Sequence, residues 1–507
     1  MTSPAPQPDA YQRAVRRFSL VSKLTAAGDM LQWDAQTQMP RGGAWARGEQ
    51  MAALTEVSTD LIVAPAAADE IAGAEEMIGA LEPDEKADVR EMRRLWAHAN
   101  AAPPELLTAK ARLSSNLQSL WVEAKAENDF AKFAKPFDEL LGVIREIAAA
   151  KAGPLGMTRY GAMIDENDPG VSEAMIDPIF ADLALALPPL IAEVRERQAR
   201  WPTPIPLPPT PVDRQIALST RLAAIVGHDP NHLRIDAAPH PFSVPHSPGD
   251  VRFTTKYDPD NTRFSIMATL HEAGHSMYEF NLPRDLAYRP AGVARGATMH
   301  ESQSLSLEML AGRSAEFLTF LAPILGETFG GDPAAWSASN IINLWRRLDD
   351  DYIRVEADEL SYPLHVILRY RLEKALMSGD LAVDDIPGAW NELFTKLLGR
   401  TPPDHARGCL QDIHWSAGLF GYFPNYAMGS VLAAQLFERA NADDADILPA
   451  LGRGDFKPYF GWVSPRIHQR ASLADFATLV EDATGAPLNT AAFKRHLHRR
   501  YLEEAAP

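Results

Sequence analysis

Two histidines and a glutamate lie close together in the stretch LHEAGHSMYEF, residues 270–280. His271 and His275 are four residues apart, so on an α-helix their imidazoles would lie on one face, about one turn apart. Zinc binds neutral imidazole nitrogens at roughly 2.0–2.1 Å and accepts such a pair. Glu272 lies beside the pair and is placed to take a proton from water. The stretch predicts a metal site with its own base; the alternative is a chance pattern in an ordinary helix.

A third ligand decides between these alternatives. Glu301, in the downstream stretch MHESQSLSLEML, is the candidate, and it would leave the fourth zinc position open, as a catalytic site requires. Glu308 lies two turns farther on and could instead be the ligand, or could orient a histidine by a hydrogen bond. A metzincin site is excluded, because its further glycine and histidine would fall on Tyr278 and Asn281.

The elements that must position these residues are predicted to be helices. Apolar residues recur at helical intervals between Pro259 and Pro283, and the same spacing fills long stretches such as residues 103–152. Gly274 inside the predicted helix costs up to about 1 kcal/mol relative to alanine, which indicates that another segment approaches closely there. One short strand is predicted at Asp250–Asp258, DVRFTTKYD, from its alternating pattern.

The whole chain, residues 1–507, is predicted to be one unit with three parts. Residues 1–200 form an N-terminal helical portion, and residues 214–507 carry the metal site. Between them, residues 201–213 read WPTPIPLPPTPVD, where proline is too dense for a helix or a central strand. This segment is predicted to be an exposed, semi-rigid connection.

Composition limits the partners. A net charge of −18 argues against binding to nucleic acid or to an anionic membrane. Cys409 is the single cysteine, and the N-terminus lacks a basic segment followed by an apolar run, so a cytoplasmic protein is expected. The most apolar stretch, residues 180–194, carries charges and is broken by Pro188 and Pro189, so no membrane helix is expected.

Five stretches of the chain, in this order, carry a resemblance to a known family: DVRFT at Asp250, HEAGH at His271, HESQS at His300, IRVEAD at Ile353 and GCLQDIHW at Gly408. In these stretches the chain resembles the carboxypeptidase Taq family of metallocarboxypeptidases, peptidase family M32. Weaker similarity extends from LQWDAQTQMP, residues 31–40, to HWSAGLFGYFPNYAMG, residues 414–429. One departure follows HESQS, where the family usually has Arg and then Trp-Glu-Asn, and this chain has Leu305 and then Leu307-Glu308-Met309.

This resemblance implies a mainly α fold: a large helical zincin-type peptidase with a deep substrate groove and a short strand beside the active-site helix. Family members are distantly similar in shape to angiotensin-converting enzyme and the neurolysin-type oligopeptidases. The resemblance also implies one Zn²⁺ per chain, with Co²⁺ as an alternative, bound by His271, His275 and Glu301, and Glu272 as general base. Members are commonly homodimers.

Substrate-binding residues follow from the same resemblance. Tyr422 is the first choice to donate to the oxyanion and Tyr426 the second, against the alternative that both are core rings. His414, from QDIHW, is a third donor. Arg354, in IRVEAD, is predicted to bind the terminal carboxylate of the substrate, with Asp358 as the residue that would orient it. The alternative is a surface pair of these two residues on one helix.

Two more residues are candidates near the predicted strand. His240 precedes the strand and could face the groove, or could be a turn histidine beside Pro241. Arg252 lies in the strand, which is predicted to line the groove, where a peptide could add as an extra strand. The alternative is a structural hairpin edge.

These features predict a zinc-dependent carboxypeptidase that removes C-terminal residues from peptides with broad selectivity. One alternative is a zinc oligopeptidase that cuts internally. Another is an inactive peptide-binding relative, against which the intact base Glu272 argues. A zinc aminopeptidase is disfavoured, because the chain lacks a G-x-M-E-N element.

Overall fold

The computed structural model describes residues 9–245, 249–348 and 351–506, and it is mainly helical, as predicted. The α-helices are α1 (Ala10–Thr37), α2 (Ala44–Val63), α3 (Pro65–Glu76), α4 (Pro83–Ala101), α5 (Pro104–Glu127), α6 (Phe130–Leu155), α7 (Arg159–Asn167), α8 (Glu173–Gln198), α9 (Val212–Val226), α10 (Thr262–Phe280), α11 (Gly296–Leu305), α12 (Ala315–Phe329), α13 (Ala338–Arg346), α14 (Tyr362–Ser378), α15 (Ile386–Leu398), α16 (Pro424–Asp443), α17 (Ile447–Leu451), α18 (Lys457–Arg466), α19 (Phe476–Thr484) and α20 (Ala491–His498). The short 3₁₀ turns are η1 (Arg41–Gly43), η2 (Ile78–Ala80), η3 (Arg284–Leu286), η4 (Pro290–Gly292), η6 (Arg354–Glu356), η7 (Val383–Asp385) and η8 (His468–Arg470). Two further turns, η5 (Ser306–Ala311) and η9 (Arg499–Glu503), are π-helical.

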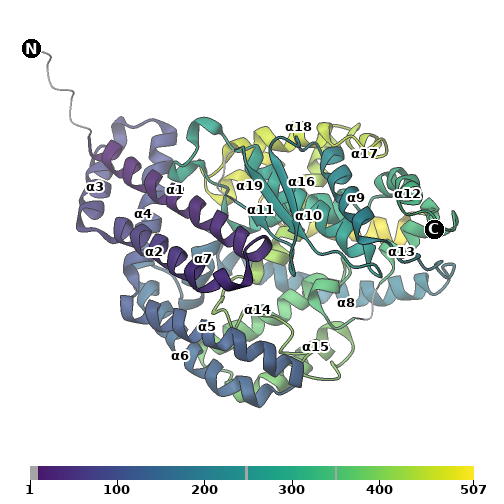
Figure 1. Ribbon diagram of the computed structural model, residues 1–507, viewed down its shortest axis with the longest axis horizontal. Helices are drawn as coiled ribbons and strands as arrows, with labels where there is room; N and C mark the ends of the chain where they lie inside the picture. The colour runs from purple at the N-terminus through teal and green to yellow at the C-terminus, as the bar shows by residue number, and fades with distance from the viewer. Residues whose placement is uncertain (1–8, 246–248, 349–350, 507) are drawn as a thin grey trace, which may run out of the picture.

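One large hydrophobic core fills most of the molecule. Its buried side chains run from Leu117 in α5 to Tyr501 in η9, so distant parts of the chain share it. A second, smaller cluster lies among α1, α3 and α4 and includes Phe18 and Ile71. Figure 1 shows these N-terminal helices together at one side of the molecule, while α10, α11 and α16 lie near its middle. The central helices therefore have packing partners on several sides.

Helix α8 precedes the proline-rich segment. By length and composition α8 could cross a membrane, and the bent pair formed by residues 41–63 and α3 would pass the same test if counted as one span. However, Leu183, Leu187 and Val194 of α8 are buried in the protein core, and α8 packs against α14 and α15. Residues 202–211 then form neither helix nor strand and are mostly exposed.

A three-stranded sheet lies against α10. Strand β3 (Val251–Thr255) is central: β1 (Leu233–Ala237) pairs with it in parallel, and β2 (Ser243–Val244) pairs with it in antiparallel fashion. The predicted strand is thus present, somewhat shorter than expected. The expected addition of a peptide strand to β3 is wrong, because Arg252 and Phe253 already have strand neighbours on both sides.

Arg252 ties the sheet to the N-terminal helix α1. Its guanidinium lies 4.8 Å from the ring centre of Trp33, and that of Arg234 lies at 4.8 Å from the same ring. Both Nε and Nη2 of Arg252 also donate to the Asp250 carboxylate at 2.8 Å. The contacts that the structure gives Arg252 are therefore structural, and its binding of substrate stays a prediction.

Helices α10 and α11 cross in very close contact at Gly274. A Cβ atom at this position would lie 2.5 Å from the carbonyl oxygen of Gln303 and 2.6 Å from Cα of Ser304. Both neighbours are backbone atoms, so only a glycine permits this distance. The close approach predicted at Gly274 is confirmed, and it brings the histidines of α10 next to the glutamate of α11.

Candidate metal centre

The three predicted metal ligands lie together. His271 and His275 come from α10, and Glu301 comes from α11. Asn261 caps the start of α10: its side chain accepts a hydrogen bond from the backbone N–H of Phe264. One ligand atom from each lies within 4.8 Å of the other two. Oε2 of Glu301 lies 3.9 Å from Nε2 of His271 and 3.5 Å from Nε2 of His275. The three side chains therefore surround one point.

The chemistry of this group fits a divalent cation. Oε1 of Glu301 is buried and has no hydrogen-bond partner among the described residues, so the carboxylate has capacity for another cation. Burial lowers the pKa of His275 to about 4, which keeps its imidazole neutral. Burial also opposes charge on His271, but the carboxylates of Glu301 and Glu308 outweigh it and raise the pKa of His271 to about 10. The carboxylates therefore favour a positive charge beside His271, and a metal ion can supply that charge.

Glu308 contacts His271 from the side away from Glu301. Its Oε2 lies 2.9 Å from Nδ1 of His271, and its Oε1 accepts a hydrogen bond from Nη2 of Arg313 at 3.2 Å. When Nδ1 donates to Glu308, Nε2 of His271 keeps a lone pair for a metal. Glu308 could be a metal ligand or could orient a histidine by a hydrogen bond, and this geometry favours the second role.

His275 has a similar support, which the sequence reasoning missed. Its Nδ1 lies 2.5 Å from Nδ1 of His300, and Nε2 of His300 lies 2.9 Å from Oε1 of Glu279. A consistent arrangement has His275 donating to His300 and His300 donating to Glu279, which leaves Nε2 of His275 as an acceptor. The available signal was the first residue of HESQS, adjacent to Glu301 in sequence.

Glu272 is buried beside the histidine pair. Oγ of Ser243, in β2, donates to its Oε2 at 2.6 Å. Burial raises the pKa of Glu272 above its ordinary value, so the carboxylate binds a proton more readily than an exposed one. Ser243 is a second residue that the sequence reasoning missed, and it fixes the position of this carboxylate.

An aromatic cluster brings together the predicted oxyanion donors. Nε2 of His414 lies 3.1 Å from the hydroxyl of Tyr426, and the ring centres of Tyr422 and Tyr426 are 5.5 Å apart. Burial and the Glu301 carboxylate raise the pKa of Tyr422 to about 12, so its hydroxyl keeps its proton. Burial and the cation of Arg354 lower the pKa of His414 to about 3, so the ring is neutral.

Arg354 lies in the same cluster, with a partner that differs from the expected one. It begins the 3₁₀ turn η6 rather than lying on an α-helix with Asp358, and its Nε and Nη2 each donate to Oδ1 of Asp412 at 3.1 Å. Asp358 instead accepts from the backbone N–H groups of Leu360 and Ser361 at 2.9 Å, at the start of α14. The expected Arg354–Asp358 pair is wrong, because the chain turns between the two residues.

Asp412 joins two arginines. Nε of Arg369 donates to its Oδ2 at 2.7 Å. Although Asp412 is largely shielded from water, Arg369 and Arg354 hold the pKa of its carboxyl well below the ordinary value. The Arg354 guanidinium also lies 4.7 Å from the ring centre of Tyr426, whose ring is 6.4 Å from that of Tyr362. Tyr362 and Asp412 were not recognised from the sequence.

His240 lies outside these groups. It is exposed in the turn before β2, and its carbonyl accepts a hydrogen bond from Thr254. It is not part of the group that could hold a metal. A role for His240 in substrate binding stays a prediction.

Gly429, in α16, determines where Glu301 can lie. A Cβ atom there would lie 2.7 Å from Cγ of Glu301 and 2.8 Å from its Cβ. We expect Gly429→Ala to displace the carboxylate and to weaken metal binding about 10–100-fold, the usual effect of disturbing a ligand's support. Metal titration of the variant checks this. Gly142→Ala, in α6, is the control, because its Cβ would meet nothing within 4 Å; equal affinity in both variants would contradict the packing argument.

Substitutions distinguish the two glutamates. His271→Ala, His275→Ala and Glu301→Ala are each expected to strip the metal, while Glu308→Ala removes only the support of His271 and should weaken binding about 10–100-fold. Elemental analysis of the purified variants measures the metal. If Glu308→Ala loses the metal and Glu301→Ala keeps it, the third ligand is Glu308.

Comparisons with known proteins agree with this geometry. The profile of the family described as "Carboxypeptidase Taq (M32) metallopeptidase" matches residues 13–501. Thermostable carboxypeptidase 1 of Thermus thermophilus is 34% identical over 97% of this chain and 98% of its own. Carboxypeptidase 1 of Bacillus subtilis is 32% identical over 95% of this chain and 96% of its own. The solved structure titled Trypanosoma cruzi metallocarboxypeptidase 1 has a TM-score of 0.94 and 36% identity, covering 97% of this chain and 99% of the other.

Proposed function

This chain belongs to the carboxypeptidase Taq (M32) family of metallopeptidases, and we propose that it removes C-terminal residues from peptides, with broad selectivity, using one zinc ion held by His271, His275 and Glu301. The observation that carries the proposal is the convergence of these three side chains beside the buried carboxylate of Glu272. Two imidazoles and one carboxylate suit zinc and leave a coordination position open; cobalt is the alternative. When bound, the cation supplies a Lewis acid that polarises the scissile carbonyl and acidifies water.

Glu272 acts as the general base in this proposal. Its carboxylate takes a proton from the attacking water and then transfers it to the departing amine. The hydrogen bond from Ser243 holds one carboxylate oxygen, which leaves the other for the water. The raised pKa of Glu272 suits a group that must both accept and return a proton.

Hydroxyl donors stabilise the oxyanion that forms on the former carbonyl. Tyr422 is the proposed first donor, because its hydroxyl stays protonated and negative charge on Glu301 lies close enough to affect its pKa. Tyr426 is the second, held by the hydrogen bond to His414. Neutral donors placed in advance stabilise the developing negative charge without needing to reorganise.

Arg354 recognises the terminal carboxylate of the peptide. Asp412 occupies the Nε side of the guanidinium, and Arg369 holds Asp412 in turn. The arginine is only 6% exposed, and a cation in that setting attracts a carboxylate strongly. In a protein with a net charge of −18, such a fixed cation is needed to bind an anionic substrate end.

Mass spectrometry of a mixed peptide pool, incubated with zinc-loaded protein, tests the proposal. We expect ladders that shorten from the C-terminus and poor cleavage of C-terminally amidated peptides. Internal fragments and equal cleavage of amidated peptides would instead favour an oligopeptidase. The absence of any cleavage would favour a peptide-binding protein.

We also propose that the protein works as a homodimer in the cytoplasm. The family resemblance supports the dimer, and the single buried cysteine, Cys409, suits a reducing compartment. Light scattering after size-exclusion chromatography measures the mass of the assembly, and a single-chain mass of 55.7 kDa would contradict the dimer.

A further inference from the structure

A cavity of about 530 Å³ lies where η5, α12, α13, α16 and η9 meet. None of the metal-site or carboxylate-binding residues described above lines it. Its volume falls in the range of sites that hold small molecules, roughly 300–1,000 Å³. The cavity is therefore large enough for a ligand of its own.

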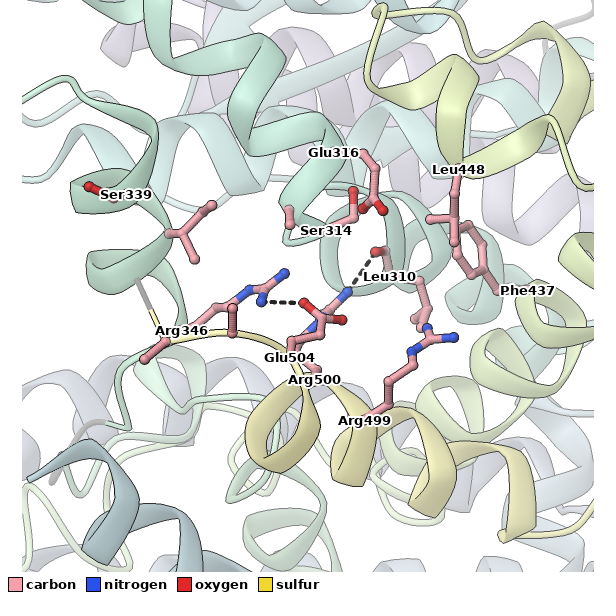
Figure 2. A pocket seen from close by; sticks show the side chains of 14 residues that line it. Leu310, Ser314, Glu316, Ser339, Arg346, Phe437, Leu448, Arg499, Arg500 and Glu504 are labelled. Carbon is pink, nitrogen blue, oxygen red and sulfur yellow. Dashed lines mark hydrogen bonds and ion pairs between the residues drawn. The ribbon is translucent and has the colours of Figure 1, made fainter. Parts of the chain in front are cut away.

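Charged groups of both signs surround the cavity. Figure 2 shows the guanidinium groups of Arg346, Arg499 and Arg500 together with the carboxylates of Glu316 and Glu504. Nη1 of Arg346 lies 2.6 Å from Oε2 of Glu504, and Nη2 of Arg500 donates to the carbonyl of Leu310 at 2.8 Å. Arg346 is paired with Glu504, and Arg500 is paired at 2.9 Å with Glu359, which lies outside the lining. Arg499 and Glu316 therefore remain as the lining charges for a ligand that carries both signs.

Two of these arginines have buried donors that lack an acceptor. Arg346 is 2% exposed and Arg500 is 5% exposed. Nη2 of Arg346 and Nε of Arg500 have no hydrogen-bond partner among the described residues. A buried donor without an acceptor is costly. Because these two atoms have almost no accessible surface, a small shift of each guanidinium is needed before a ligand oxygen reaches it. A carboxylate is the acceptor that suits a guanidinium best.

The rest of the lining is apolar. Leu310, Ile342, Phe437 and Leu448 contribute side chains to the cavity wall. An anion of any kind would suit the arginines, but this wall favours a ligand with an apolar body. The carboxylate of Glu316, which is exposed at the cavity, suits an ammonium group.

We propose that this cavity binds a free amino acid with an apolar side chain. Its α-carboxylate faces the guanidinium of Arg499, beside Arg346 and Arg500, its ammonium group faces Glu316, and its side chain lies against the apolar wall. A carboxypeptidase releases one free amino acid in each turnover, so the ligand belongs to the class of the enzyme's own products.

Hydrogen bonds connect the cavity to the metal centre. Arg500 donates to the carbonyls of Met309 and Leu310, in the same π-helical turn η5 that carries Glu308, the partner of His271. Nε of Arg346 donates to the carbonyl of Arg313 at 3.1 Å, and Arg313 binds Glu308. A ligand that engages Arg346 and Arg500 therefore shifts the support of a metal ligand, and the proposal includes a change in turnover.

Calorimetric titration with leucine tests the site. We expect binding to the wild type and at least about tenfold weaker binding to Arg499→Ala, which removes one charge-assisted contact. Glu316→Gln should weaken the binding of leucine but not that of N-acetyl-leucine, because N-acetyl-leucine has no ammonium group. Leucinamide, which lacks the carboxylate, and glycine, which lacks the side chain, should bind poorly to the wild type. Arg495→Ala is the matched control, because Arg495 lies on α20 but does not line the cavity and pairs with Glu438.

Leucine could also enter the active site as a product, so the titration is repeated with Arg354→Ala protein. Binding that persists in Arg354→Ala and is lost in the double variant Arg354→Ala, Arg499→Ala supports the cavity. Binding that is unchanged by Arg499→Ala and by Glu316→Gln overturns it. In kinetic assays we expect leucine to change kcat in the wild type and not in Arg499→Ala; an effect confined to KM in both overturns the coupling to the metal centre.

Discussion

Glu272→Gln is expected to bind zinc as well as the wild type does and to lose most turnover. The amide is nearly isosteric with the carboxylate, and the three ligands are other residues, so the metal group stays intact. The amide cannot accept the proton, and loss of a general base typically lowers kcat by roughly 10²–10⁴-fold. Steady-state kinetics on a peptide with a free C-terminus, together with elemental analysis, give both quantities.

Glu392→Gln is the control for this variant, because Glu392 is exposed on α15, away from the metal group. It should keep wild-type kcat. Ser243→Ala should give an intermediate loss, since it frees the carboxylate of Glu272 without removing it. Wild-type kcat in metal-loaded Glu272→Gln would falsify the assignment of the base.

The second large effect is expected at Arg354. Arg354→Ala should cost about 2–5 kcal/mol in kcat/KM for peptides with a free C-terminus, the usual scale for breaking a buried charge pair. Amidated peptides, already poor substrates, should change little. Asp412 keeps Arg369 as a partner in this variant, so its charge is not left unpaired and the fold is expected to persist.

Lysine at position 354 should restore activity only in part, because an ammonium offers a point charge without the planar fork. Arg407→Ala is the control: Arg407 is exposed and pairs with Asp404 in the chain segment before Asp412. If Arg354→Ala lowers cleavage of free and amidated peptides equally, Arg354 supports the site structurally and does not bind the carboxylate.

The local part of the site was predictable from the sequence. Helical spacing places His271 and His275 on one face of α10. The cost of Gly274 predicted a close approach by another segment, which the structure shows to be α11. Both inferences rest on neighbours within one element, where 3.6 residues per turn sets the geometry. The downstream stretch holds two glutamates, of which Glu301 is the predicted ligand and Glu308 the alternative, and the structure groups Glu301 with the two histidines.

Contacts between distant segments were not predictable in the same way. The partner of Arg354 is Asp412 and not Asp358. A pair with Asp358 would require an α-helix from residue 354 to residue 358, but Arg354 lies in a three-residue 3₁₀ turn. The central position of β3 depends on β2, which has only two residues and carries almost no pattern. The hydrogen bond from His300 to Glu279 joins α11 to α10, and a sequence pattern cannot show which side chains meet across two helices.

Arg500 has a consequence for the order in which the molecule is completed. It donates to the carbonyl of Met309, 191 residues earlier in the chain, and to Glu359, 141 residues earlier. On the ribosome, the helix with the two histidines and the helix with Glu301 emerge long before Arg500 is synthesised. The turn that carries Glu308 and the loop that follows Arg354 lack this common partner until then. A growing chain therefore completes the support of its peptidase site only when nearly all of its sequence has been synthesised.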